Sequence, residues 1–143
     1  MNEDVKNFYD ICIDRVCDWL EEEEEISVEF ISEPGNFYYY EDGIISICSR
    51  QSVKNRLFSL LHEAGHHLAR KSKLWADSPK KNDKYYRVGV LMEEVLAWSS
   101  AERVAKDLDI WSGIDGKDWN KFIKEQLYDY ACWTANPKKY VGE

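Results

Sequence analysis

The stretch Leu57-Phe58-Ser59-Leu60-Leu61-His62-Glu63-Ala64-Gly65-His66-His67-Leu68-Ala69 decides how the rest of the sequence is interpreted. Its apolar residues recur at spacings of three and four, which predicts an amphipathic helix over residues 50–71. His62 and His66 fall on a stripe beside the apolar one, so we expect them next to the core. An internal glycine costs a helix about 1 kcal/mol relative to alanine. Gly65 therefore indicates that another element packs closely against this helix.

His62, Glu63 and His66 form a His-Glu-x-x-His motif. Helix residues four positions apart lie on one face, about 6 Å from each other, so both imidazoles can reach a single metal ion. The intervening glutamate then points at the open position of the metal. His67 is expected to be a satisfied surface group or a neighbour of the ligands.

A catalytic metal bound by two histidines needs at least one more protein ligand, and all three histidines of the chain already lie in this stretch. The helix predicted over residues 88–109 offers Glu93 and Glu94. Glu94 is favoured because the other residues on its helix face are small or apolar. A carboxylate on such a face is costly unless it is paired or metal-bound. Glu93 stays the alternative. The residues that share the face of Glu94 are Ala97, Trp98, Ala101 and Ala105.

This ligand set, with a glutamate base beside it, favours Zn²⁺ over other divalent metals. Zinc lowers the pKa of a bound water to about 7, and Glu63 would accept the proton and later pass it to a leaving amine. A substrate strand is expected to add to the sheet edge beside the site. A donor for the oxyanion is usually required as well, and the sequence does not rank the candidates Tyr85, Tyr86, Tyr128 and Tyr130.

The remaining pattern predicts an α+β fold in a single domain, residues 1–143. A small antiparallel sheet of about three strands would pack on a bundle of about four helices, with the zinc site on two adjacent helices. Asp42-Gly43 between two β-prone runs predicts a hairpin with a type I′ turn. The acidic run Glu21 to Glu25 is expected to be a solvated helix end. The predicted helices span residues 4–20, 50–71, 88–109 and 118–132, the strands 26–31, 37–40 and 44–48, and a loop 72–86.

Composition narrows the functional class further. The net charge of −8 argues against a general nucleic-acid binder. Residues 1–49 carry 14 acidic and 2 basic side chains, whereas residues 50–87 carry 3 acidic and 10 basic ones. We expect the basic segment to neutralise the acidic one, with an acidic partner as the alternative. No apolar run is long enough for a membrane helix, and no secretion signal is visible, so we expect a cytoplasmic protein. The four cysteines form no Cys-x-x-Cys pair, and in that compartment we expect them to be reduced thiols.

Residues 43–108 resemble a minimal gluzincin metallopeptidase, and among such families the ImmA/IrrE-like peptidases, which are common in phages and mobile elements. The resemblance is carried by Gly43-Ile-Ile-Ser-Ile47, by Arg56, by Leu60-Leu-His-Glu-Ala-Gly-His66 and by Glu94-Val-Leu-Ala97. It implies that Glu94 is the third zinc ligand, that the chain is a zincin of phage origin and that it cleaves a regulatory protein. Two departures concern the substrate class: Trp98 stands where the family has asparagine, and Ser100-Ala101 replaces its Phe-Ala.

Two functions follow as hypotheses. The first is a zinc-dependent endopeptidase that acts on a protein or peptide substrate, with His62, His66 and Glu94 as ligands and Glu63 as general base. The alternative is a catalytically silent zincin-fold module that sequesters a host or phage protein. The intact Glu63 favours the first, because a purely structural zinc site needs no base. The sequence leaves the oligomeric state open.

Overall fold

The computed structural model describes residues 2–72, 81 and 83–136, and in these it has the predicted α+β fold, with four α-helices and a three-stranded sheet. The four predicted helices are present, and their ends differ from the predicted ones by a few residues. Most of the predicted loop 72–86 lies outside the described residues. The elements are α1 (Glu3–Glu23), β1 (Ser27–Ile31), β2 (Phe37–Tyr39), β3 (Ile44–Cys48), α2 (Val53–Lys71), α3 (Tyr86–Asp107), a short 3-10 helix η1 (Trp111–Gly113) and α4 (Gly116–Ala135).

The sheet has the strand order β1-β3-β2, and it is mixed. β2 pairs antiparallel with β3, but β1 pairs parallel with it, from Ser27 opposite Ile44 to Ile31 opposite Cys48. The prediction of a wholly antiparallel sheet is therefore wrong for β1. After β1 the chain crosses to the far edge, and the β2–β3 hairpin then returns its second strand to the centre. This order gives the central position to the most apolar strand, in which Ile45 and Ile47 are completely buried.

The predicted hairpin between β2 and β3 is confirmed, but its turn differs from the predicted one. Gly43 has a φ of 65°, whereas Asp42 does not have the positive φ that a type I′ turn requires. The backbone N–H of Gly43 donates to the carbonyl oxygen of Tyr39 at 3.0 Å. This hydrogen bond closes a connection that is longer than the two-residue loop of a type I′ turn. The Asp-Gly pair thus marks the hairpin, and the glycine supplies the single left-handed residue that ends it.

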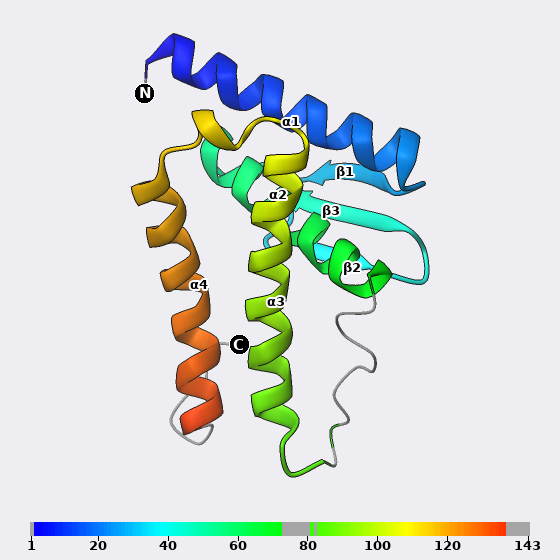
Figure 1. Cartoon of the computed structure of the whole chain (residues 1–143), viewed down its shortest axis with the longest axis vertical. Coiled ribbons are helices and arrows are strands. Elements are labelled where there is room, and N and C mark those ends of the chain that lie inside the picture. Colours follow the sequence, from blue (N-terminus) through cyan, green and yellow to red (C-terminus); the bar gives the residue numbers. More distant parts are fainter. Residues whose placement is uncertain (1, 73–80, 82, 137–143) are drawn as a thin grey trace.

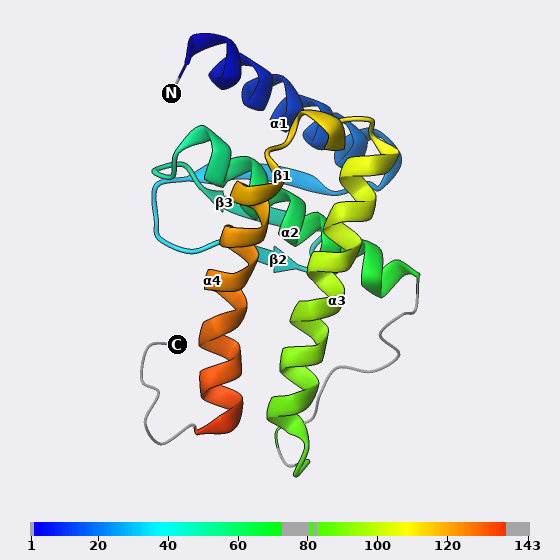
Figure 2. The same ribbon diagram turned by 60° about the vertical axis from the view of Figure 1, so that its left-hand side comes forward.

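The helices enclose the core between the sheet and one another. α1 contacts β1 and α2, and α2 also contacts β2 and β3. Figures 1 and 2 show α3 and α4 side by side and antiparallel, with α1 across the end where η1 joins them. No helix in the described part of the chain has the length and hydropathy to cross a membrane. The four cysteines, all among the described residues, are free thiols.

α3 approaches α2 closely at Gly65. A Cβ atom built on this residue would lie 2.1 Å from the carbonyl oxygen of Ala97 and 2.8 Å from the backbone nitrogen of Ala101. Both alanines are completely buried. The close packing that Gly65 predicted is therefore present, and it brings the histidine face of α2 against the Glu94 face of α3.

Candidate metal centre

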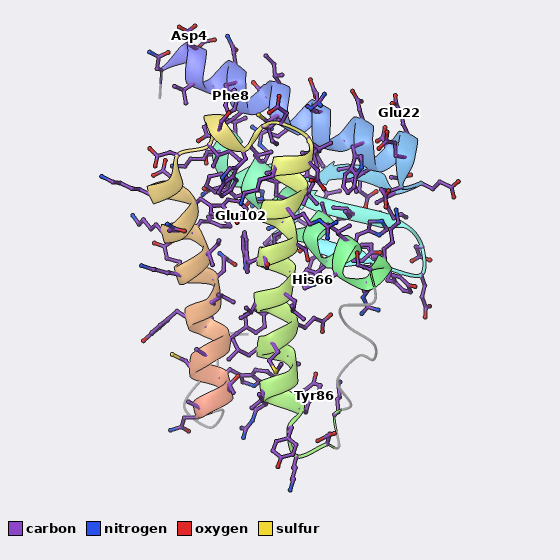
Figure 3. The ribbon with its side chains drawn as sticks, viewed as in Figure 1. Asp4, Phe8, Glu22, His66, Tyr86 and Glu102 are labelled. Carbon is purple, nitrogen blue, oxygen red and sulfur yellow. The ribbon has the colours of Figure 1, made fainter. Side chains whose placement is uncertain are left out.

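Three side chains from two helices meet where α2 packs against α3; Figure 3 labels one of them, His66. His62 and His66 come from successive turns of α2, and Glu94 comes from α3. The Nε2 atom of His62 lies 2.7 Å from Glu94 Oε2, and the Nε2 atom of His66 lies 3.4 Å from the same oxygen. One ligand atom from each residue lies within 4.8 Å of the others. The group could therefore hold a metal ion.

The three side chains are enclosed but not sealed, with 10% of Glu94, 14% of His66 and 15% of His62 exposed. Burial alone would raise the pKa of Glu94, but hydrogen bonds from His62 and His66 outweigh it and hold that pKa well below its usual range. Burial would lower the pKa of His66, and its hydrogen bond to Glu94 reverses this and raises the pKa. An ionised carboxylate thus faces two imidazoles, a donor set that suits a divalent transition metal.

Glu93 lies beside this group and not within it. Its Oε1 atom is 4.0 Å from Nδ1 of His66 and 3.8 Å from the guanidinium of Arg70. Glu94 takes the position inside because it lies one turn before Ala97 and Trp98, on the face of α3 that packs against α2. Of the two carboxylates that the sequence offered, the structure therefore places Glu94 with the histidines.

Glu63 lies next to the group on α2, and its side chain is 8% exposed. Its Oε1 atom is 3.8 Å from Nδ1 of His62. Burial raises the pKa of Glu63, although the neighbouring His62 and His66 act in the opposite direction. A carboxylate with a raised pKa is a stronger base than an ordinary glutamate, which suits it to accept a proton.

All four side chains line one cavity of about 950 Å³. Phe37 and Tyr38 of the edge strand β2 form one wall, and Phe122 and Tyr130 of α4 form another. Residues of β2, an edge strand of the sheet within the described part of the chain, therefore border the same cavity as the metal-binding group.

The structure ranks the four candidate tyrosines. Tyr130 lines the cavity, whereas Tyr85 and Tyr128 are 64% and 67% exposed, and the ring of Tyr86 packs against Trp133 at 6.0 Å. Burial, together with the nearby Glu94, raises the pKa of Tyr130. Its hydroxyl therefore stays protonated at neutral pH and can donate a hydrogen bond into the cavity.

A partly buried network of hydrogen bonds around His67 was not predicted from the sequence, apart from the expectation that His67 is satisfied. His67 Nε2 lies 2.8 Å from Glu24 Oε1, and His67 Nδ1 lies 2.8 Å from the hydroxyl of Tyr38. Lys71 donates to both carboxylate oxygens of Glu24 at 2.9 Å. Only 7% of the Glu24 side chain is exposed, so the expectation that the whole acidic run is solvated is wrong at this residue. These hydrogen bonds link the end of α1 and the edge strand β2 to α2, the helix that carries the histidines.

Replacing Glu24 by glutamine is expected to lower the free energy of unfolding by about 1–3 kcal/mol at pH 7, because the charged acceptor of two donors is lost. Burial raises the pKa of Glu24, but hydrogen bonds from Lys71 and His67 outweigh it, so the folded-state pKa lies below the ordinary 4.5. The carboxylate therefore stabilises the fold fully above pH 4.5, and this contribution is lost as the pH falls through the folded-state pKa. Urea unfolding of both proteins at pH 7 and in acid measures the difference, which should shrink in acid.

The matched control for this measurement is Glu22→Gln. Glu22 lies on the exposed side of the same helix, α1 (Figure 3), and its replacement should change the free energy of unfolding by less than about 0.5 kcal/mol. Equal losses in the two variants would show that the general charge of α1, and not the bonds to Glu24, affects stability.

No protein-family model, curated protein or solved structure matches this chain. The resemblance to the ImmA/IrrE-like peptidases therefore rests on its motif residues alone and stays a prediction.

Proposed function

We propose that the protein is a zinc-dependent endopeptidase that hydrolyses a peptide bond in a protein substrate. The observation that carries the proposal is the placement of Glu63, a buried carboxyl that shares one cavity with His62, His66 and Glu94. Two imidazoles and one carboxylate are typical of a catalytic zinc site that keeps a position open for water or substrate. A structural zinc site usually has four protein ligands and needs no base.

The chemistry assigns a separate task to each group. Bound zinc would supply a Lewis acid that acidifies water and polarises a carbonyl. Glu63 accepts a proton from the water while the water oxygen attacks the carbonyl carbon. Glu63 then returns that proton to the amine nitrogen when the C–N bond breaks. The Tyr130 hydroxyl lines the same cavity near Glu94, and it can donate to the oxygen on which negative charge develops.

The strand that borders the cavity supports an extended substrate. β2 is an edge strand, and Phe37 and Tyr38 from it border the same space as Glu63. The free backbone groups of an edge strand can pair with a peptide in extended conformation. Such pairing would bring a peptide bond past Glu63 without a requirement for one particular sequence, and this supports a protein or peptide as the substrate.

The first test is the metal content of the purified protein. One zinc per chain is expected, and the His62→Ala and Glu94→Ala variants should lose it because each removes one of three ligands. Glu93→Ala is the matched control and should retain zinc, since its carboxylate lies outside the group. Mass spectrometry measures the ratio of metal to protein. A folded wild-type protein that takes up no zinc when zinc is added would contradict the proposal, and loss in Glu93→Ala alone would reassign the third ligand.

A further inference from the structure

Trp98 contacts the candidate metal centre but has no part in the proposed reaction. Its indole lies flat on the imidazole of His62, with 4.2 Å between the ring centroids and 5° between the planes. Among the ring pairs of the described residues it is the one in stacked geometry. Trp98 is on α3, one turn after Glu94, so one helix supplies both a ligand and a flat surface for another ligand.

The indole itself is held from behind. Trp119 and Phe122 of α4 meet it edge to face, with centroid distances of 5.4 and 5.7 Å and interplanar angles of 81° and 72°. Only 3% of Trp98 is exposed. These contacts restrict rotation of the indole, and the His62 ring stacked on it is restricted in turn.

The polar atom of Trp98 contributes nothing that the structure records. Its Nε1 is buried and has no hydrogen-bond partner among the described residues. An unpaired buried N–H is unfavourable, so what Trp98 offers at this position is its ring face. Among the described residues, the structure records one acceptor near Nδ1 of His62, the Oε1 of Glu63 at 3.8 Å, which is too far for a hydrogen bond. Metal-binding histidines are usually oriented by a hydrogen bond at that second nitrogen.

We infer that Trp98 is the positioning residue of His62 and that it orients this metal ligand by stacking instead of by hydrogen bonding. The inference rests on the proposed zinc site. The imidazole plane that Trp98 fixes is the one that directs Nε2 of His62 towards Glu94. A metal ion on that nitrogen withdraws electrons from the imidazole, and the electron-rich face of an indole then attracts the ring more strongly. Trp98 therefore favours the metal-loaded state over the empty one.

Zinc affinity tests the inference without any need for a peptidase substrate. Trp98→Leu removes the flat surface and is expected to weaken zinc binding about 10- to 100-fold, as loss of an orienting group does in other metal sites. Trp98→Phe keeps a ring against His62 and removes the unpaired N–H, so it should retain most of the affinity. Competition with a chelator gives the dissociation constants, and circular dichroism confirms that each variant is folded.

Fluorescence gives a second readout that simple core packing would not produce. Zinc is expected to change the tryptophan emission of the wild-type protein and of Trp19→Phe, in which a tryptophan on α1 is replaced, but not that of Trp98→Phe. Equal zinc affinity in wild type and Trp98→Leu, or an unaltered zinc response in Trp98→Phe, would overturn the inference and leave the proposed function standing. Absence of zinc binding in the wild-type protein would overturn both.

Discussion

Glu63→Gln is expected to bind zinc as tightly as the wild-type protein and to hydrolyse peptides about 10²- to 10⁴-fold more slowly. The amide has nearly the shape of the carboxyl, so the cavity and the ligands should keep their places. It cannot accept a proton from water or return one to the leaving amine, and both steps of the proposed reaction depend on that transfer. A mixture of peptides of varied sequence, with products identified by mass spectrometry, measures the rate while the zinc content of the same samples is determined.

The control for this variant is Glu125→Gln. Glu125 lines the same cavity from α4, but it is exposed and makes no ion pair with the histidines that the structure records. The same chemical change there should leave the rate within about threefold of wild type, in keeping with the small effects of most surface substitutions. Full activity in Glu63→Gln would remove Glu63 from the mechanism. A zinc-loaded wild-type protein that cleaves nothing, and that captures a protein partner equally well with Glu63→Gln, would favour the binding module.

The parts of the fold that sequence predicts well are those set by local periodicity. The spacing of apolar residues located α2 and α3, and the helical phase distinguished Glu94 from Glu93 because a one-residue step rotates a side chain by about 100°. The turn residue Gly43 marked the hairpin for a similar reason, since its backbone conformation is a local matter. Each of these signals lies within a few residues of the feature that it predicts.

Features that depend on distant contacts escaped prediction. Glu24 has acidic neighbours on both sides and looks solvated, but it is buried by His67 and Lys71, which are 43 and 47 residues away. The stack of Trp98 on His62 joins two helices, and nothing in the local sequence distinguishes it from ordinary core packing. The central place of β3 is likewise a property of the whole sheet. The sequence predicted the three side chains that come together and could hold a metal ion, but it did not predict the side chains that support them.

Gly65→Ala is expected to unfold the protein more easily and to abolish zinc binding. Helix propensity alone predicts the opposite sign, because alanine stabilises a helix interior by about 1 kcal/mol relative to glycine. At this position, however, the new Cβ would lie 2.1 Å from the carbonyl oxygen of Ala97, and the backbone of α3 cannot rotate away as a flexible side chain would. The contact can be relieved only if α2 and α3 separate. The cost of such overpacking is typically about 1–3 kcal/mol and is higher where backbone must move, so destabilisation should win.

The same separation explains why the metal is expected to be lost. Ala97 lies one turn after Glu94, so a shift of α3 at Ala97 carries the carboxylate away from the 2.7 Å contact with His62. Gly116→Ala is the matched control, because a Cβ on that residue meets nothing within 4 Å. It should leave the zinc content unchanged and should not lower the free energy of unfolding, because an unstrained replacement of glycine by alanine is neutral or stabilising. If Gly65→Ala proved as stable as wild type and kept its zinc, the close contact of α2 with α3 would not be what holds Glu94 beside the histidines.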